Sequence, residues 1–472
     1  MSLRTLGVLL ALGALGACDA PDKDPAEGLI RGARAQLHPD QGSIVVVEWA
    51  QQEPTEWSWV EYSVDPEEWR QTPPIAGTEG EPRQLIVGLP YQGEISWRVV
   101  AAQGDETTSS ETSSIQTADL PRRLPPTQVD LGDPAAWQPG ADFLFTSVSH
   151  RSPFKGDSRF WLVILDRKGR YVWAQEGQDD VWTLFARPSK DGRAILWDQP
   201  YFWALSDNEL SQVHRQRLDG TVERSWSTPG LHHSFDEIDA ETILFSGVES
   251  GTDRVLIAEG EEPARVIWDC QTWLVAEDLQ DPENSHSCGA NALSWHEATD
   301  QIVLSLFSSE AVLSIDRQSA EVLWFAEPAR GLGLPVDPPW AWQHDAHLLD
   351  EGSLLLFSGI RDEGGGIGDD LSGSAVYQYR LDPEDGGLEL EWSLPSDEWV
   401  SNLKGGASRL ANGNTLVNYG DLGGVREFDA QGGIVWELTF DTAPDAERRE
   451  HWVGRTTFIE DLYAMTEAAS TP

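Results

Sequence analysis

Four of the ten histidines in this sequence stand in two pairs, each pair just ahead of an apolar run. His232 and His233 open the segment LHHSFDEIDAETILFSG, and His344 and His347 stand in WQHDAHLLDEGSLLLFSG. An imidazole can act as a nucleophile or as a general acid or base near neutral pH, so both pairs are candidates for covalent or acid–base catalysis. The alternative for each pair is structural, with the rings hydrogen-bonding neighbouring loops to one another.

A recurring pattern indicates which elements position these histidines. A short acidic or glycine-containing turn followed by a strand that ends in tryptophan occurs six times, and a hairpin such as RLANGNTLVNYG stands between the copies. The six tryptophans are Trp173, Trp226, Trp268, Trp324, Trp392 and Trp436. Repeats of about 40 to 60 residues with about four short strands each are typical of a β-propeller. The sequence therefore predicts six blades, with the tryptophans packed between them.

The histidine pairs stand where each of two blades begins. In a propeller, the residues that open a blade's inner hairpin lie near the central channel. We therefore expect both pairs to line the channel of a propeller that spans residues 136–465. A short tail, residues 466–472, follows it.

The fold class is predicted to be all-β, with a small β-sandwich ahead of the propeller. Residues 30–118 alternate apolar and polar positions between turn residues, which is typical of half-buried strands. The segment LIVGLPYQGEISWRVVA resembles the later strands of fibronectin type III modules. Residues 119–135 are rich in proline and read as a linker.

The N-terminus has the features of an export signal. Residues 1–18 carry one arginine, an apolar run too short to span a bilayer, and LGAC ending at Cys18. This ending resembles a bacterial lipoprotein processing site, which would lipidate Cys18, leave residues 19–29 as an acidic tether and anchor the chain in the membrane of the cell envelope. The alternative is an ordinary cleaved signal peptide with an incidental cysteine.

Only two other cysteines occur, Cys270 and Cys288. Because an exported chain meets an oxidising compartment, we expect them to form one disulfide. The chain has 79 acidic and 33 basic residues, a net charge of −46. Such a surface repels phosphate backbones and argues against nucleic-acid binding. The sequence does not determine an oligomeric state.

The order of the motifs from HHSFDEIDAETILFSG through WQHDAHLLDEGSLLLFSG to GRTTFIEDLY resembles the bacterial arylsulfotransferases, which are six-bladed periplasmic propeller enzymes. The resemblance spans roughly residues 138–463. It implies transfer of a sulfuryl group from an aryl sulfate to a phenol through a histidine intermediate, with no cofactor and no metal. The partners would be a small aromatic sulfate and a phenol.

The resemblance also assigns roles to individual residues. His344 would be the nucleophile, His233 (or His232) would assist it, and Arg455 would hold the sulfonate. The remaining predicted substrate-binding residues are His232, His347, Asn291 and Trp342.

The sequence departs from the family pattern at three positions where the family has a histidine or an arginine. These positions are Gly289, Phe307 and Ala375. Two hypotheses remain open. The chain is a sulfotransferase with a rearranged site, which requires His344 and a cationic partner, or it is a catalytically silent propeller that binds a ligand or protein.

Overall fold

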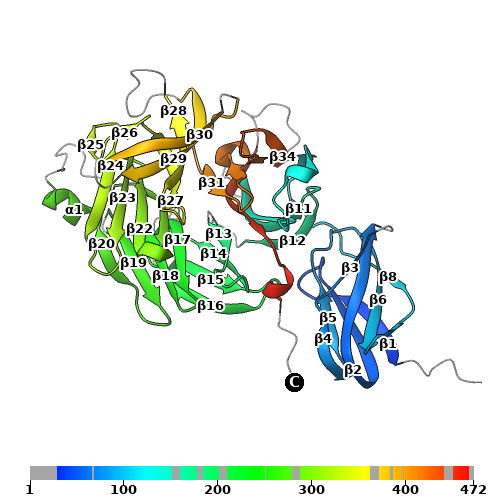
Figure 1. Cartoon of the computed structure of the whole chain (residues 1–472). Helices are drawn as coiled ribbons and strands as arrows, with labels where there is room; N and C mark the ends of the chain where they lie inside the picture. The colour runs from blue at the N-terminus through cyan, green and yellow to red at the C-terminus, as the bar shows by residue number, and fades with distance from the viewer. Residues whose placement is uncertain are drawn as a thin grey trace, which may run out of the picture.

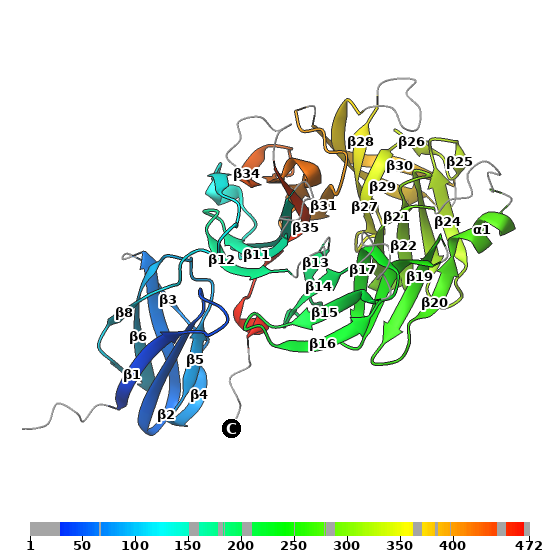
Figure 2. The ribbon, with the colours of Figure 1, turned by 180° about the vertical axis from the view of Figure 1, so that it is seen from behind.

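The structure is a computed structural model, and it confirms the predicted all-β class and the six-bladed propeller (Figure 1, Figure 2). The residues that it describes are 29–65, 68–150, 160–177, 183, 185–200, 210–249, 251–277, 279, 288–361, 371–382, 386–396, 398–440 and 450–466. The predicted signal with Cys18, nearly all of the predicted tether and all but the first residue of the predicted tail lie outside these residues. Within them, no helix is both long and apolar enough to cross a membrane.

Each blade is a sheet of antiparallel strands that succeed one another from the channel outward. The first three blades are β35 (His451–Ile459), β10 (Phe143–His150), β11 (Phe160–Asp166) and β12 (Tyr171–Glu176); β13 (Ala186–Pro188), β14 (Ile195–Gln199), β15 (Gln212–Gln216) and β16 (Val222–Ser227); and β17 (Leu231–Asp239), β18 (Thr242–Glu249), β19 (Thr252–Glu259) and β20 (Arg265–Asp269).

Each of the other three blades has a fifth strand. They are β21 (Ala290–His296), β22 (Gln301–Leu306), β23 (Ala311–Asp316), β24 (Val322–Glu327) and β25 (Leu332–Gly333); β27 (Ala341–Leu348), β28 (Leu354–Ile360), β29 (Gly373–Asp382), β30 (Gly387–Ser396) and β26 (Val336–Asp337); and β31 (Gly406–Arg409), β32 (Thr415–Asn418), β33 (Gly424–Phe428), β34 (Ile434–Phe440) and β9 (Thr127–Asp130). The short strand β26 departs from the antiparallel pattern, because it pairs in parallel with β30. The described helical segments are α1 (Cys270–Ala276), η1 (Pro134–Ala136), η4 (Glu297–Thr299), η5 (Gly420–Leu422) and η7 (Tyr463–Met465).

The two ends of the propeller segment close the ring. The C-terminal strand β35 becomes the innermost strand of the first blade, where it pairs with β10 from Phe143↔Ile459 to His150↔His451. At the other end, β9 pairs with β34 and forms the outer edge of the last blade. Part of the proline-rich segment 119–135 is therefore a propeller strand.

The recurring tryptophans pack between the blades, as the sequence predicts. Trp173, Trp226, Trp268 and Trp436 are buried, whereas Trp324 and Trp392 are partly buried. The indole N–H of Trp173 donates to the Leu218 carbonyl, that of Trp226 to the Glu241 carbonyl and that of Trp436 to the Arg167 carbonyl. Each of these acceptors belongs to the following blade, so the indoles hydrogen-bond adjacent blades as well as filling the space between them.

The N-terminal module lies where the β-sandwich is predicted. Its strands are β1 (Ile30–Leu37), β2 (Val45–Asp65), β3 (Glu68–Gln71), β4 (Ile75–Gly80), β5 (Arg83–Ile86), β6 (Glu94–Gln103), β7 (Glu106–Ser109) and β8 (Ser113–Gln116). The long strand β2 pairs with five of the others. Val45, Val47 and Trp97 belong to the core of the module. Because side chains alternate along a strand, Val46 points the other way, toward the propeller.

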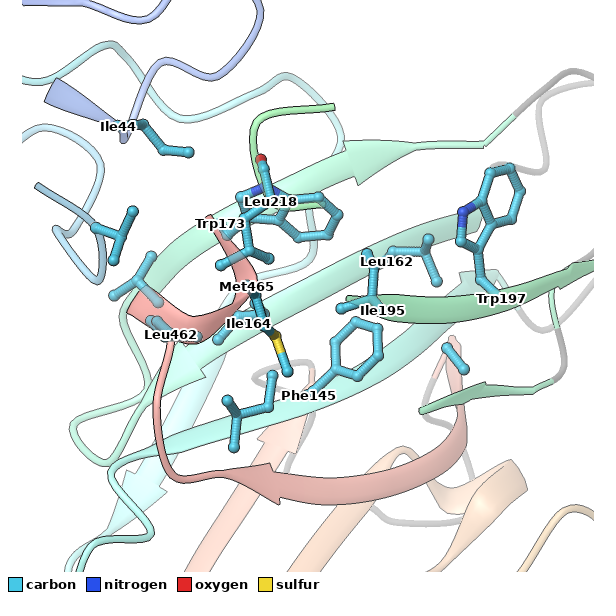
Figure 3. Close-up of a cluster of buried hydrophobic side chains, with 14 of the residues drawn as sticks. Ile44, Phe145, Leu162, Ile164, Trp173, Ile195, Trp197, Leu218, Leu462 and Met465 are labelled. Atoms are coloured by element: carbon cyan, nitrogen blue, oxygen red, sulfur yellow. The ribbon is translucent and has the colours of Figure 1, made fainter. Parts of the chain in front are cut away.

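This alternation builds a joint between the module and the first blade (Figure 3). Ile44 and Val46 share one buried cluster with Phe145, Trp173 and Met465. The apolar run IVVV is continuous because its two faces are buried in two different cores.

The predicted disulfide between Cys270 and Cys288 is present, with the two Cα atoms 6.4 Å apart. Cys270 begins α1 after the outer strand of the third blade, and Cys288 directly precedes the inner strand of the fourth. The bond therefore joins the outside of one blade to the channel side of the next.

We expect Trp436→Ala to lower the free energy of unfolding by about 3–5 kcal/mol, because it leaves a cavity between the last and first blades and removes a hydrogen bond. Trp57 is 42% exposed, so Trp57→Ala is the matched control and should change stability by less than about 0.5 kcal/mol. Urea unfolding followed by circular dichroism measures both. Equal effects would contradict an interblade role for Trp436.

Candidate functional site

The predicted catalytic residues stand on three inner strands of the ring. His233 is on β17, His344 on β27 and Arg455 on β35. The pairing register is irregular on all three strands. The irregularities lie between Leu231 and Phe235, on both sides of His344, and between Val453 and Thr456, where Arg455 stands. Bulges of this kind redirect a side chain out of the regular pleat and are common beside functional sites.

Left-handed backbone conformations accompany the bulges. His233 has a φ of 67°, and Trp342 and Asp345, which flank His344 and Gln343, have φ values of 47° and 56°. Residues other than glycine adopt this conformation at a cost and keep it only where the surroundings enforce it. The fold therefore maintains strained backbone at both histidine motifs.

His344 is buried, and its hydrogen bond defines its tautomer. Its Nδ1 lies 2.8 Å from the Trp342 carbonyl oxygen. A carbonyl only accepts hydrogen bonds, so Nδ1 carries the proton and Nε2 carries the lone pair. Burial and the positive charge of Arg455 lower the pKa of His344 to about 4. The ring is consequently neutral near pH 7, with Nε2 as a nucleophilic atom.

His232 and His233 form a hydrogen-bonded pair, and His232 also makes an ion-pair contact with a buried carboxylate. Their Nδ1 atoms are 2.7 Å apart, and Nε2 of His232 lies 2.9 Å from Oδ1 of Asp253. Burial, and then the charges of His232, His344, Lys404 and Arg455, lower the pKa of His233 well below the ordinary value. His233 therefore interacts electrostatically with His344 of the second histidine motif and with Arg455.

Arg455 is held by residues at the inner strands of the fifth and sixth blades. Its Nε lies 3.2 Å from Oδ1 of Asp345, and its Nη1 donates to the Gly405 carbonyl. Burial lowers the pKa of Arg455, and Asp345 opposes this effect. A Cβ atom on Gly406 would lie 2.6 Å from Asp345 Oδ2 and 2.7 Å from Arg455 Nη1, so a larger residue would displace the ion pair.

A second cation of the site, Lys404, was not singled out from the sequence. It directly precedes the two glycines that open the inner strand of the last blade, and its Nζ lies 4.8 Å from the centre of the Trp452 ring. Burial lowers its pKa to about 7, although Asp198 and Asp421 act in the opposite direction. Its place just ahead of the inner strand of a blade is the signal that the sequence offered.

The other predicted substrate-binding residues take different positions. Asn291 uses its amide nitrogen to donate to the Gln343 carbonyl at 2.7 Å, which fixes the strand next to His344. His347 Nδ1 lies 2.8 Å from the Asp345 carbonyl, three residues further along the strand than His344. Trp342 lies beside Phe307, with ring centres 5.5 Å apart.

The three departures from the family pattern have structural counterparts. Gly289 has a φ of 68°, and a Cβ atom there would lie 2.2 Å from Ser308 Oγ, so a histidine would be strained and would require Ser308 to move. The ring of Phe307 meets that of His344 at 5.8 Å. Ala375 is buried on β29, the third strand of its blade, where it packs in the core.

Comparisons with known proteins agree with the predicted family. The Arylsulfotransferase (ASST) family profile matches residues 286–441, which include His344 and Lys404. No curated protein matches the sequence.

Solved structures with similar folds share little sequence with this chain. The nidogen/laminin complex covers 67% of this chain and 98% of its own, with 9% identity and a TM-score of 0.40. A catalytically inactive virginiamycin B lyase from Staphylococcus aureus with quinupristin covers 66% and 99%, with 8% identity and a TM-score of 0.36. A shared activity does not follow from similarity at this level.

Lys404 should make anion binding depend on pH. Because its pKa is about 7, the ammonium is charged at pH 6 and mostly neutral at pH 8. We expect the affinity for benzenesulfonate, measured by calorimetry, to fall about tenfold over this interval, since a charge-assisted hydrogen bond contributes about 1.5–3 kcal/mol.

The variant Lys404→Gln should bind benzenesulfonate weakly at both pH values. Lys168→Gln is the control, because Lys168 pairs with Asp65 of the N-terminal module. An unchanged pH dependence in Lys404→Gln would exclude this lysine from the site.

Proposed function

We propose that this arylsulfotransferase-like propeller transfers a sulfuryl group from an aryl sulfate to a phenol through His344. The observation that carries the proposal is the state of this ring. It is buried and neutral, its Nδ1–H is engaged by the Trp342 carbonyl, and its pKa is lowered partly by Arg455. A neutral imidazole beside a cation is the arrangement that attack on an anionic ester requires.

In the first half-reaction, Nε2 of His344 attacks the sulfur atom of the donor. The N–S bond forms, the S–O bond to the aryl group breaks, and the phenolate leaves with the bonding electrons. The ring becomes positively charged, and the Trp342 carbonyl stabilises it because it accepts the Nδ1 proton. Arg455 and Lys404 balance the negative charge of the sulfonate oxygens.

In the second half-reaction, the oxygen of an acceptor phenol attacks the same sulfur atom. The S–N bond breaks and returns the lone pair to Nε2 of His344. The acceptor must lose its proton, and His233 is the base available in the same electrostatic field. Both half-reactions thus use one nucleophile and one pair of cations, which predicts ping-pong kinetics.

The changed residues fit a rearranged site. The arginine expected at position 307 is absent, and Lys404 supplies a second positive charge from another blade. The aromatic rings of Phe307 and Trp342 lie together beside His344 and offer a surface for a planar aryl group. A sulfate ester carries one negative charge, which a partly protonated lysine and one arginine suffice to neutralise.

A catalytically silent binding propeller is the second candidate. Two observations favour it, namely the strain that a histidine would meet at position 289 and the contact of the Phe307 ring with His344. We propose for either function that the chain is exported and lipid-anchored in the cell envelope. The disulfide supports export, because such bonds persist in oxidising compartments.

The deciding experiment is rapid mixing of the protein with 4-nitrophenyl sulfate, with and without added phenol. We expect a burst of nitrophenolate equal to one site per protein, followed by turnover that depends on phenol. His344→Ala should abolish both, and mass spectrometry of the quenched wild type should find one sulfuryl group on the peptide that contains His344. His38→Ala, on the N-terminal module, is the control and should behave as wild type.

Lack of a burst and of turnover in correctly folded wild-type protein, across several donors and acceptors, would contradict sulfuryl transfer. The silent propeller would then be the better description of the molecule.

A further inference from the structure

We propose that Asp253 is a positioning residue for the acceptor half-reaction, acting through His232 to make His233 the base that deprotonates the phenol. The inference rests on the proposed function and concerns a residue that the sequence motifs did not indicate. In this proposal, His232 and His233 act together as one base.

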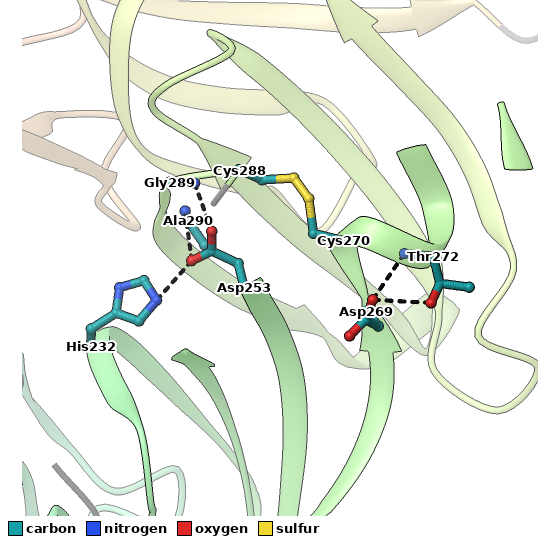
Figure 4. The surroundings of a disulfide bond; sticks show 8 residues. All are labelled: His232, Asp253, Asp269, Cys270, Thr272, Cys288, Gly289 and Ala290. Carbon is teal, nitrogen blue, oxygen red and sulfur yellow. Dashed lines mark hydrogen bonds and ion pairs between the residues drawn. A yellow bond between two sulfur atoms is a disulfide. The ribbon is translucent and has the colours of Figure 1, made fainter. Parts of the chain in front are cut away.

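Asp253 is fully buried on β19, the third strand of its blade (Figure 4). Two backbone amides donate to its carboxylate, and the His232 ring makes an ion-pair contact with it. His232 Nε2 lies 2.9 Å from Oδ1, the Gly289 amide donates to Oδ2 at 2.7 Å, and the Ala290 amide donates to Oδ1 at 3.3 Å. A carboxylate can only accept, so both amides donate to it.

The neighbouring blade holds this carboxylate in place. Gly289 follows Cys288, whose disulfide fixes the start of the fourth blade to Cys270 at the end of the third. On the other side, the Ser246 hydroxyl donates to the His232 carbonyl at 2.6 Å. Backbone amides therefore hold the Asp253 carboxylate, and the Ser246 hydroxyl holds the His232 backbone.

These contacts determine which nitrogen atoms carry protons. Since a carboxylate only accepts, Nε2 of His232 is protonated, and in the neutral ring Nδ1 has the lone pair. That lone pair faces Nδ1 of His233 at 2.7 Å, so His233 donates its Nδ1 proton. The remaining nitrogen of His233, Nε2, then has no proton and is the basic atom.

The two histidines can also transfer the proton of the phenol away from the site of reaction. When Nε2 of His233 takes the proton of the phenol, the Nδ1 proton of His233 moves to Nδ1 of His232. His233 is neutral again, and His232 becomes an imidazolium paired with Asp253. The positive charge has moved away from the cations of the site.

This displacement matters because His233 stands in a positive field. His232, His344, Lys404 and Arg455 all disfavour its protonation, and burial does so most strongly. Asp345 is engaged by Arg455, so Asp253 is the carboxylate that forms an ion-pair contact with the histidine pair. Without it, a proton taken up by His233 would remain among like charges.

The test uses Asp253→Asn, which keeps an oxygen for the backbone amides and removes the charge. We expect an unchanged burst of nitrophenolate, because release of this leaving group needs no base. Transfer to a weakly acidic phenol should slow about 100-fold, the size of a general-base contribution. Acceptors that are already ionised at the assay pH should react at nearly the wild-type rate.

Two further variants separate positioning from structure. Asp253→Glu restores the charge and should recover part of the transfer rate. Asp269→Asn is the matched control, because Asp269 lies near the same disulfide but pairs with Arg254 and caps α1 (Figure 4). It should leave both half-reactions unchanged. Equal slowing of burst and transfer by Asp253→Asn would overturn the proposal.

A second readout does not depend on turnover. In ¹⁵N-histidine spectra of the wild type, we expect a protected proton on Nε2 of His232 that is absent or rapidly exchanging in Asp253→Asn. Should the wild type fail to show a burst, sulfuryl transfer is wrong and this spectrum still decides the tautomer. An Nε2 resonance that is identical in both proteins would exclude Asp253 as the group that sets the protonation of the pair.

Discussion

Closure of the ring by β35 is the constraint on which the rest of the structure depends. This strand comes from the end of the described chain and forms the channel side of the first blade, where it pairs with β10 over its length. It brings Arg455 to the channel, opposite strands that begin more than 100 residues earlier. The cation and the nucleophile consequently meet only when the first and last parts of the propeller have joined.

The channel residues are strained and charged in a protein that is otherwise acidic. The net charge is −46, yet Arg455 and Lys404 both act on the buried histidines. Exposed carboxylates are screened by salt over about 8–10 Å, whereas buried groups interact through a low-dielectric interior. A locally positive site is therefore compatible with a strongly negative surface, and left-handed backbone at His233 and beside His344 keeps the rings in place.

The departures from the family pattern are connected to one another. At position 289 the left-handed backbone disfavours a side chain, and its amide donates to the carboxylate that contacts His232. At position 307 an aromatic ring replaces a charge, and Lys404 on a different blade contributes a charge to the same field. The loss of polar side chains at positions 289 and 307 is thus accompanied by polar groups elsewhere, namely the Gly289 amide and the Lys404 ammonium.

The sequence by itself determined the all-β class, the number of blades, the packing role of the tryptophans and the disulfide, because each depends on short-range periodicity or on the count of a rare residue. It also marked His344 and Arg455 as candidates through motifs. Only the tertiary structure showed that Lys404 and Asp253 lie near the candidate catalytic residues. It also decided which nitrogen atoms of His232, His233 and His344 carry a proton. A tautomer depends on an acceptor that lies close to one ring nitrogen, and a lowered pKa depends on burial. Strands from different blades provide both, and they meet only in the folded protein.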